Sequence, residues 1–337
     1  MTRYNKNLLN ILKDSKVLYK LNKNILSHKN LNINDTVLIC GSPRSGTTWF
    51  EEMMINLLNY TYLHEPLHPG WYPESIDAGF NARSSYIPVG KQNKKAEEYL
   101  EKTFKGKTYS FLPNYNINPN LIMNYLSGDK LLVKSVRMNR LLPWITENFE
   151  LKKIFLIIRH PCAVVSSQLK SSFIGYHSPN PPYDPMFPKT KNIIEDASNI
   201  NELNQRIIKK LNGIKSKEEI LAAAWCLDAY VPINYKDKKW TTIFYEDYVK
   251  SPKEIVNKII DDNNFKIPKN FDIDNVNKPS MSVMEKNKKT VTKTDKQLSK
   301  WKKNLSEKQI KNILKVVSDF ELNIYDEDIT PHYNPLK

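Results

Sequence analysis

The segment that most constrains the fold is residues 37–58, where an apolar run stops at a glycine turn and resumes in a helical pattern. The run VLIC ends at Gly41, the turn SPRSG follows, and a helix-like segment continues to Leu58. In this order, the backbone N–H groups of the loop and the positive end of the helix dipole face the same point. The segment therefore predicts an anion-binding loop, and the alternative is a tight strand-to-helix turn with a capping threonine.

The side chains of this loop favour a short anion over a triphosphate. Arg44 supplies a cation suited to forked contacts with phosphate-like oxygens, and Thr47 and Thr48 supply hydroxyl donors. The nucleotide-kinase pattern GxxxxGK[ST] needs a lysine after its second glycine to reach the β- and γ-phosphates. Thr47 occupies that position here. The loop is therefore better suited to a ligand with one phosphate next to the reacting group than to a triphosphate.

A second segment repeats the order of strand, turn and helix. Residues 152–158 have the pattern of a buried strand, with apolar residues on both faces as a parallel sheet requires. The sequence RHPCAVVSS follows, and Pro161 with the small residues after it indicates a turn into a helix. Arg159 then lies at the strand end, with Ser167 eight residues later. On its own, Arg159 is more often a surface charge than a ligand.

The loop GSPRSGTTW closely resembles the 5′-phosphosulfate loop of the sulfotransferases, which take sulfuryl groups from 3′-phosphoadenosine 5′-phosphosulfate (PAPS). In that family an arginine at the later strand end and a serine eight residues on bind the 3′-phosphate, and Arg159 and Ser167 stand in those places. Segments 240–252 and 300–310 resemble the family's YED and terminal W-K segments. The resemblance implies a PAPS site without a metal, and the expected cofactor-binding residues are Arg44, Ser45, Gly46, Thr47, Thr48, Trp49, Arg159, Ser167 and Tyr245.

Two cations are expected at the reacting group. Sulfuryl transfer depends on alignment of the acceptor oxygen and on stabilisation of the leaving phosphate. Arg44 is the first candidate for that stabilisation, and Lys134, at the end of the strand pattern LLVKSVR, is the second. Cytosolic small-molecule sulfotransferases carry K-x-H at this point and use the histidine as base. This sequence has Val136 in its place, which excludes that mechanism.

The missing base is expected in the segment HEPLH, residues 64–68. It resembles the E-P-L-W-H segment of N-acetylglucosamine 6-O-sulfotransferases, and VKSVRM resembles their VK-x-VR segment. In related enzymes a glutamate from this region deprotonates the sugar hydroxyl, so the resemblance implies that Glu65 is the catalytic base. A cap or an ion pair is the alternative for Glu65, and His64 and His68 are rival bases. Arg137 is expected to contact the acceptor or to form a structural ion pair.

Strand patterns alternate with helix patterns along the chain. This alternation predicts an α/β fold, with a P-loop-like parallel sheet of about five strands flanked by helices. The strands are expected at residues 36–40, 60–63, 130–133, 154–158 and 241–244. The helices are expected at residues 47–58, 94–105, 218–235, 252–262 and 306–322.

The chain is expected to form a single sulfotransferase-like domain at residues 36–325. An N-terminal helix and linker at residues 1–35 precede it, and a tail at residues 326–337 follows. Acceptor-binding loops are expected at residues 67–92 and 171–215. No helix is expected within residues 171–192, because that stretch contains five prolines.

Composition limits the partners and the setting. The net charge is +15, but the lysines are spread along the chain and no nucleic-acid-binding motif is present, so no nucleic-acid partner is expected. No apolar run approaches the ~18 residues of a membrane span. Cys40, Cys162 and Cys226 have apolar neighbours and are expected to be reduced core residues of a cytoplasmic protein.

The function that the resemblance implies is transfer of a sulfuryl group from PAPS to a hydroxyl of a carbohydrate or glycolipid, which releases adenosine 3′,5′-bisphosphate. Protein-tyrosine and small-molecule acceptors are the alternatives within this chemistry. A P-loop kinase is disfavoured by the missing lysine, and a non-catalytic nucleotide-binding protein by the complete set of site residues. A basic segment of the family that covers the 3′-phosphate corresponds to a run in which no single lysine stands out, namely Lys286, Lys288, Lys289 and Lys293.

Overall fold

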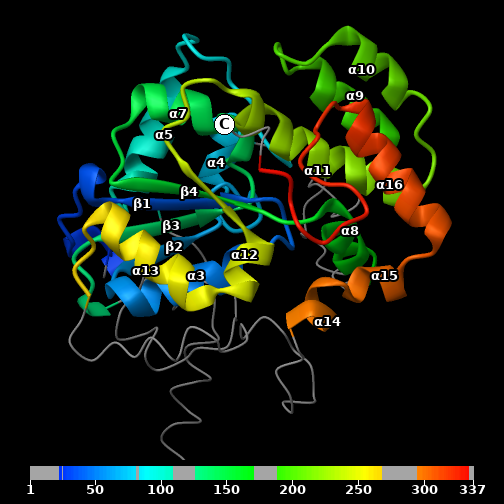
Figure 1. Cartoon of the computed structure of the whole chain (residues 1–337). Helices are drawn as coiled ribbons and strands as arrows, with labels where there is room; N and C mark the ends of the chain where they lie inside the picture. The colour runs from blue at the N-terminus through cyan, green and yellow to red at the C-terminus, as the bar shows by residue number, and fades with distance from the viewer. Residues whose placement is uncertain are drawn as a thin grey trace, which may run out of the picture.

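A parallel five-stranded sheet forms the centre of the molecule (Figure 1). The computed structural model describes residues 23–24, 26–80, 83–108, 126–170, 188–267 and 294–333. The strands lie in the order β2-β3-β1-β4-β5, and every neighbouring pair is parallel. This confirms the predicted α/β fold. The bounds are β1 Val37–Gly41, β2 Thr61–His64, β3 Leu131–Ser135, β4 Lys153–Ile158 and β5 Thr241–Phe244.

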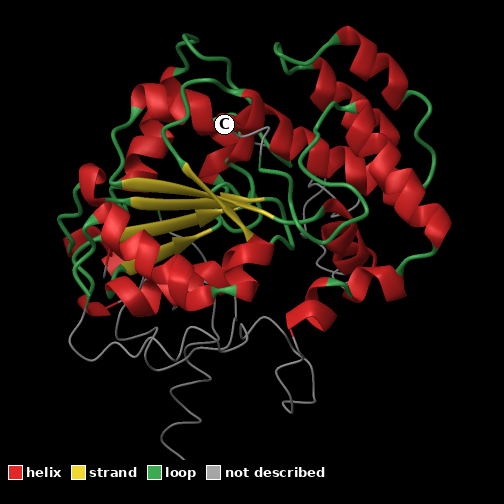
Figure 2. Cartoon of the chain, viewed as in Figure 1, coloured by secondary structure: helices red, strands yellow, loops and turns green. Residues whose placement is uncertain are grey.

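Helices cover both faces of the sheet, as its doubly apolar strands require (Figure 2). Along β1, the side chain of Leu38 belongs to one core and that of Ile39 to the other, and both are fully buried. The Ile39 face packs against α3 (Thr47–Leu58), α12 (Tyr245–Lys250) and α13 (Pro252–Asn263). The Leu38 face packs against α5 (Lys94–Phe104), α7 (Leu142–Asn148) and the helices described next.

A second group of helices lies beyond the carboxyl ends of the strands, around the long helix α11 (Lys217–Asn234) (Figure 1). Ser216 and Glu219 begin α11 with a capping box, which satisfies the first N–H groups of the helix. Most side chains along α11 are buried, because α8 and α16 pack against it. The other elements are η1 (Ile33–Asp35), α4 (Glu74–Asp77), η2 (Asn139–Leu141), α8 (Pro161–Lys170), α9 (Thr190–Ser198), α10 (Gln205–Leu211), α14 (Thr294–Leu298), α15 (Lys300–Asn304) and α16 (Glu307–Asp319).

Two predictions about segments are wrong in detail. The stretch 171–192 is predicted to hold no helix, yet α9 begins at Thr190, where Asn192 accepts from the Lys189 N–H. Prolines immediately before a helix start do not oppose it, because the first N–H groups of a helix need no intrahelical acceptor. The last helix is predicted to reach residue 322 but ends at Asp319, because the chain turns left-handed at Glu321 (φ 59°).

Other predictions fall outside the described residues or stay untested. Residues 171–187, most of the N-terminal helix predicted in residues 1–35, and the lysines between positions 286 and 293 lie outside the described part. Within the predicted acceptor loops, the described residues form α4, α9 and α10. The assignment of residues 36–325 to a single domain stays a prediction.

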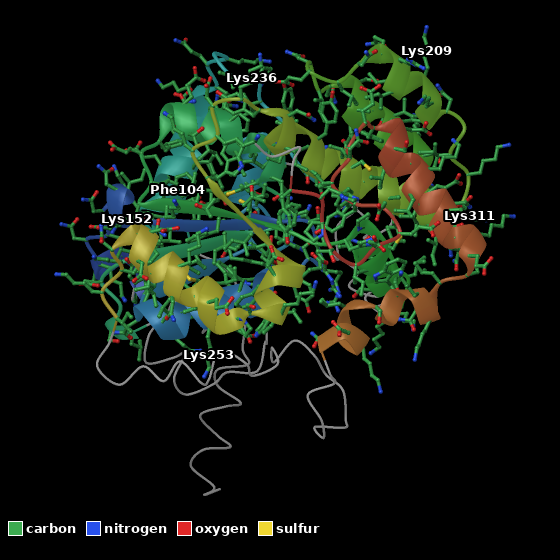
Figure 3. All side chains as sticks on the ribbon, viewed as in Figure 1. Phe104, Lys152, Lys209, Lys236, Lys253 and Lys311 are labelled. Atoms are coloured by element: carbon green, nitrogen blue, oxygen red, sulfur yellow. The ribbon has the colours of Figure 1, made fainter. Side chains whose placement is uncertain are left out.

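Positive charge is distributed over many elements. Figure 3 shows Lys152, Lys209, Lys236, Lys253 and Lys311 on separate parts of the outer surface, and all five are exposed. In the described residues, none of the helices combines the length and the apolar composition that crossing a membrane requires.

The three cysteines are buried free thiols, as predicted for core residues. Cys162 lies in the first turn of α8, close to the predicted 3′-phosphate segment. Burial raises the pKa of its thiol to about 12. A thiol that stays protonated at neutral pH is a poor nucleophile, so Cys162 is not expected to act as one.

Candidate active site

The predicted anion loop connects the carboxyl end of β1 to the start of α3, and two of its positions require glycine. A Cβ atom at Gly41 would lie 2.6 Å from the Ile157 carbonyl oxygen on β4. Gly46 has φ +91° and would drive a Cβ atom into the ring of Tyr245. Gly46 also precedes the first turn of α3, and no side chain caps that turn. The N–H groups of the helix terminus are therefore available to an anion.

The two predicted phosphate segments meet, although they are more than a hundred residues apart in the sequence. The Arg44 Nε donates to the Ser167 Oγ at 3.1 Å. A second hydrogen bond links the same segments, because the Arg159 NH1 donates to the Arg44 carbonyl oxygen at 3.0 Å. Arg44 is also held at φ +74°, a conformation that costs a non-glycine residue free energy and that is enriched at functional sites. The loop after β1 and the helix after β4 thus form one cationic junction.

Aromatic rings form one wall of this junction. The Arg159 guanidinium carbon lies 4.2 Å from the centroid of the Tyr245 ring. The Trp49 ring meets the same ring edge-on, at 5.9 Å between centroids. Tyr245 stands where β5 ends and α12 begins, and its hydroxyl accepts from Gln297 Nε2 of α14 at 3.1 Å. Residues from three strand ends and from the C-terminal helices are therefore brought together.

The remaining loop residues differ in their burial and hydrogen bonding. Ser45 is fully buried, its N–H donates to the Ser42 carbonyl oxygen at 3.0 Å, and its Oγ has no hydrogen-bond partner among the described residues. Thr47 is buried with its methyl group against the Gly41 position, whereas Thr48 is half-buried. In the described residues, the buried Arg159 Nε also has no hydrogen-bond partner. A buried N–H donor without a partner, next to an uncapped helix terminus, is suited to donate to an anionic ligand.

A second cluster lies at the ends of β2 and β3, where the predicted catalytic pair Glu65 and Lys134 is buried. The Lys134 Nζ lies 2.5 Å from the Glu65 Oε1, and the Val136 N–H donates to Oε2 at 3.0 Å. Glu65 has φ +51°, so it shares left-handed backbone geometry with Arg44. Burial raises the pKa of Glu65, but the Lys134 ammonium, His64 and the Val136 N–H outweigh burial and hold it below its ordinary value.

The histidines beside Glu65 differ in their contacts. The His64 Nδ1 lies 2.8 Å from Oε2 and 3.0 Å from Oε1 of Glu51, a buried carboxylate of α3. His68 stacks on the Trp71 ring at 4.2 Å between centroids. Burial, with the positive charge of Arg137, lowers the pKa of His68 to about 4.

The register of the sheet shows that residues of the second cluster lie on the sheet face covered by α3, the helix that begins at the anion loop. His64 pairs with Lys134, and Lys134 pairs with Ile39, so the three side chains lie on the sheet face that α3 covers. The first turn of α3 follows the anion loop, and its Thr47 lies one turn before Glu51 on the same buried face. All of these residues gather at the carboxyl ends of the parallel strands, where α/β sheets bind ligands.

Sequence reasoning missed Glu51 and Gln297. Glu51 carried one usable signal, because it is a carboxylate on a helix face that is otherwise apolar, at i+4 from Thr47. Gln297 carried none, since its contact with Tyr245 depends on how α14 packs. Arg137, predicted to contact the acceptor or to form an ion pair, donates from NH1 to the Arg83 carbonyl oxygen at 2.9 Å.

No model of a known protein family matches the sequence, and no curated protein matches it. The solved structures that are similar to this chain include two sulfotransferase domains. The sulfotransferase domain from the Synechococcus PCC 7002 olefin synthase has 15% identity and a TM-score of 0.44, and covers 89% of this chain and 98% of that domain. The sulfotransferase domain from the curacin biosynthetic pathway has 17% identity and a TM-score of 0.40, and the match covers 85% of this chain and 96% of that domain.

Proposed function

We propose that this protein is a PAPS-dependent sulfotransferase, which moves a sulfuryl group to an acceptor hydroxyl. The observation that carries the proposal is the contact between Arg44 and Ser167 at 3.1 Å. It joins two segments that were each assigned to a phosphate from sequence, and Arg159 completes the junction. Two cations and a helix terminus at one place suit a cofactor with two separate phosphate groups.

Each residue of the junction has a role in this proposal. Arg159 and Ser167 hold the 3′-phosphate, while Arg44 and the start of α3 hold the 5′-phosphate. Trp49 and Tyr245 flank the adenine. PAPS supplies the sulfuryl group when bound, and Lys134 stabilises the negative charge that develops on the leaving phosphate.

Glu65 supports this role of Lys134. Its carboxylate fixes the ammonium at 2.5 Å, and its own backbone N–H donates to the Lys134 carbonyl oxygen at 2.7 Å. Preorganised charge of this kind lowers the barrier because it needs no rearrangement during the reaction.

The acceptor in this proposal is a hydroxyl of a carbohydrate or glycolipid. Its support is the likeness of HEPLH and VKSVRM to segments of N-acetylglucosamine 6-O-sulfotransferases. Tyrosine residues of proteins and small molecules are the alternatives, and a panel of glycans, lipids and peptides with labelled PAPS separates them. We also propose a reducing, cytoplasmic setting, which the three buried free thiols support.

Thermal unfolding with adenosine 3′,5′-bisphosphate tests the cofactor. A ligand that binds only the folded state stabilises it by about 2.7 kcal/mol at a hundredfold excess over its dissociation constant. We expect the bisphosphate to raise the melting temperature without Mg²⁺, and ATP to do so far less because it lacks a 3′-phosphate. An equal or larger shift with Mg²⁺ and ATP would favour a kinase and overturn the proposal.

A further inference from the structure

We propose that His64, oriented by Glu51, is the base that accepts the proton of the acceptor hydroxyl, and that Glu65 serves to position Lys134. This inference rests on the proposed sulfotransferase function and revises the expectation that Glu65 is the base. It depends on three observations: the contact between His64 and Glu51, the hydrogen bonds of Glu65, and the register of β2 and β3.

The contact between His64 and Glu51 fixes the tautomer of the imidazole. Both distances from Nδ1 to the carboxylate oxygens, 2.8 and 3.0 Å, are hydrogen-bond distances. An ionised carboxylate only accepts, so Nδ1 carries the proton and Nε2 carries the lone pair of a neutral ring. The Glu51 side chain is 4% exposed and that of His64 is 14% exposed. A nearly buried carboxylate therefore orients a histidine that keeps some contact with the surface, and stabilises the imidazolium that forms.

The hydrogen bonds of Glu65 make it a poor base. Its oxygens accept from the Lys134 ammonium and the Val136 N–H. Burial acts to raise its pKa, but these donors and His64 hold the pKa below the ordinary value of 4.5. General bases work best when their pKa lies near the working pH, and a lowered carboxyl pKa moves Glu65 away from it.

The register places His64 beside the cation that the reaction needs. His64 and Lys134 are paired across β2 and β3, on the sheet face covered by α3. The charged and titratable groups near His64 include Glu51 from α3, Glu65 after β2, Lys134 from β3 and His68 from the adjoining loop, and Arg137 in turn lies near His68.

His68 is a weaker candidate than its neighbour. Its ring stacks on Trp71, and its Nδ1 accepts from the Gly70 N–H at 3.2 Å. Burial and Arg137 lower its pKa to about 4. No carboxylate contact comparable to that of Glu51 is present for His68 among the described residues.

The proposed step is balanced. The proton of the acceptor hydroxyl moves to the His64 Nε2, and the acceptor oxygen forms a bond to sulfur. The bond between sulfur and the bridging oxygen of the leaving phosphate breaks, and that oxygen keeps the electron pair. Lys134 and Arg44 stabilise the resulting charge, Glu51 balances the imidazolium, and the proton passes to solvent after the reaction.

The test compares His64→Ala, Glu51→Gln and Glu65→Gln in the full chain, with labelled PAPS and an acceptor from the panel. We expect His64→Ala to lower kcat by roughly 10²–10⁴ and to leave the affinity for adenosine 3′,5′-bisphosphate nearly unchanged. Added imidazole should restore part of the rate. Glu51→Gln should move the acid limb of the pH profile of kcat to lower pH, because the imidazolium loses its partner carboxylate. Glu65→Gln should keep that limb, although its kcat falls.

Two further readouts separate the possible failures. In ¹⁵N NMR spectra, which need no acceptor, the His64 ring should carry its proton on Nδ1 in the wild type and lose this preference in Glu51→Gln; an unchanged tautomer would remove the role of Glu51. If His64→Ala keeps most of its kcat while Glu65→Gln loses both rate and acid limb, Glu65 is the base and the inference is wrong. If the wild-type protein neither binds the bisphosphate nor transfers sulfuryl groups, the proposed function itself is wrong.

Discussion

Arg159 is held from two sides at the carboxyl end of β4. Its guanidinium lies over the Tyr245 ring at 4.2 Å, and its NH1 donates to the Arg44 carbonyl oxygen at 3.0 Å. A planar group fixed by both stacking and hydrogen bonding loses little conformational entropy when it binds a phosphate. Arg159 is thus positioned before any ligand arrives.

Replacing Arg159 should weaken cofactor binding and preserve the fold. We expect Arg159→Ala to lower the affinity for adenosine 3′,5′-bisphosphate by about 2–4 kcal/mol, the effect of removing one partner of a desolvated charge pair. Isothermal titration calorimetry measures this change. The control is Lys209→Ala, which removes an exposed charge from α10, away from the sheet (Figure 3). Equal affinities of Arg159→Ala and wild type would show that Arg159 is only a surface charge.

Gly46 offers a prediction with a matched control, because Gly79 has the same φ of +91°. A Cβ atom at Gly46 would meet the Tyr245 ring, whereas one at Gly79 has nothing within 4 Å. Gly79→Ala should therefore cost only the backbone strain, about 1–3 kcal/mol. Gly46→Ala should lower the urea midpoint further, and adding Tyr245→Ala should remove the excess. An identical midpoint for the two single variants would contradict this geometry.

At the scale of elements, the strands and the first helix were predictable because their patterns are local. The strands β1, β3 and β4 are runs of apolar residues that end at a glycine or a charged residue, and the helix at residues 47–58 was predicted with its observed bounds. The start of α9 was missed, because prolines mark both a loop and a helix N-terminus. The contact between Glu65 and Lys134 could not be predicted from the sequence. The two residues are 69 positions apart, and their contact depends on the register of β2 and β3.

The turn from β4 to α8 connects the sheet to the C-terminal elements through His160. Its Nδ1 accepts from the Cys162 N–H at 3.1 Å, and its Nε2 donates to the Asp326 carbonyl oxygen at 3.0 Å. The ring stacks on Trp301 of α15 at 4.5 Å between centroids. Burial lowers the pKa of this histidine to about 4, so the folded protein holds the ring neutral.

This shift predicts a pH dependence of stability. Between pH 6.5 and about 4 the unfolded chain protonates this histidine and the folded protein does not, so stability is lost as the pH falls through that window. The loss should approach about 3 kcal/mol, at about 1.4 kcal/mol per pH unit. Urea unfolding at pH 7.5 and 4.5 should show a smaller loss for His160→Gln than for wild type. Parallel losses in the two proteins would place the pH dependence elsewhere.

At the scale of the whole molecule, a buried charge cluster joins the sheet side to the second group of helices. Arg140, which is 1% exposed, donates to Asp228 of α11 and to Asp196 of α9, each at 3.1 Å. Arg83 and Ser84 contact the same Asp228 carboxylate. The sequence did not indicate this cluster, because its members are far apart in the chain and no local pattern pairs them.

Breaking this cluster should destabilise the whole fold. Asp228→Ala leaves Arg140 buried without its main partner, and we expect a loss of about 3–5 kcal/mol in the free energy of unfolding. The control is Glu101→Ala, which breaks the exposed ion pair with Lys105 on α5 and should cost less than about 1 kcal/mol. Urea denaturation measures both. A loss near the control value would mean that water reaches Arg140 and replaces the carboxylate.

The bond between Arg44 and Ser167 has a consequence for turnover. The Ser167 Oγ accepts from the Arg44 Nε at 3.1 Å, so the serine keeps its own O–H as a donor. One hydroxyl can then contact the arginine and a phosphate oxygen at the same time, and the two segments need not separate when a nucleotide enters or leaves. Because release of product limits the rate of many enzymes, we expect exchange of the nucleotide to proceed without rearrangement of this junction.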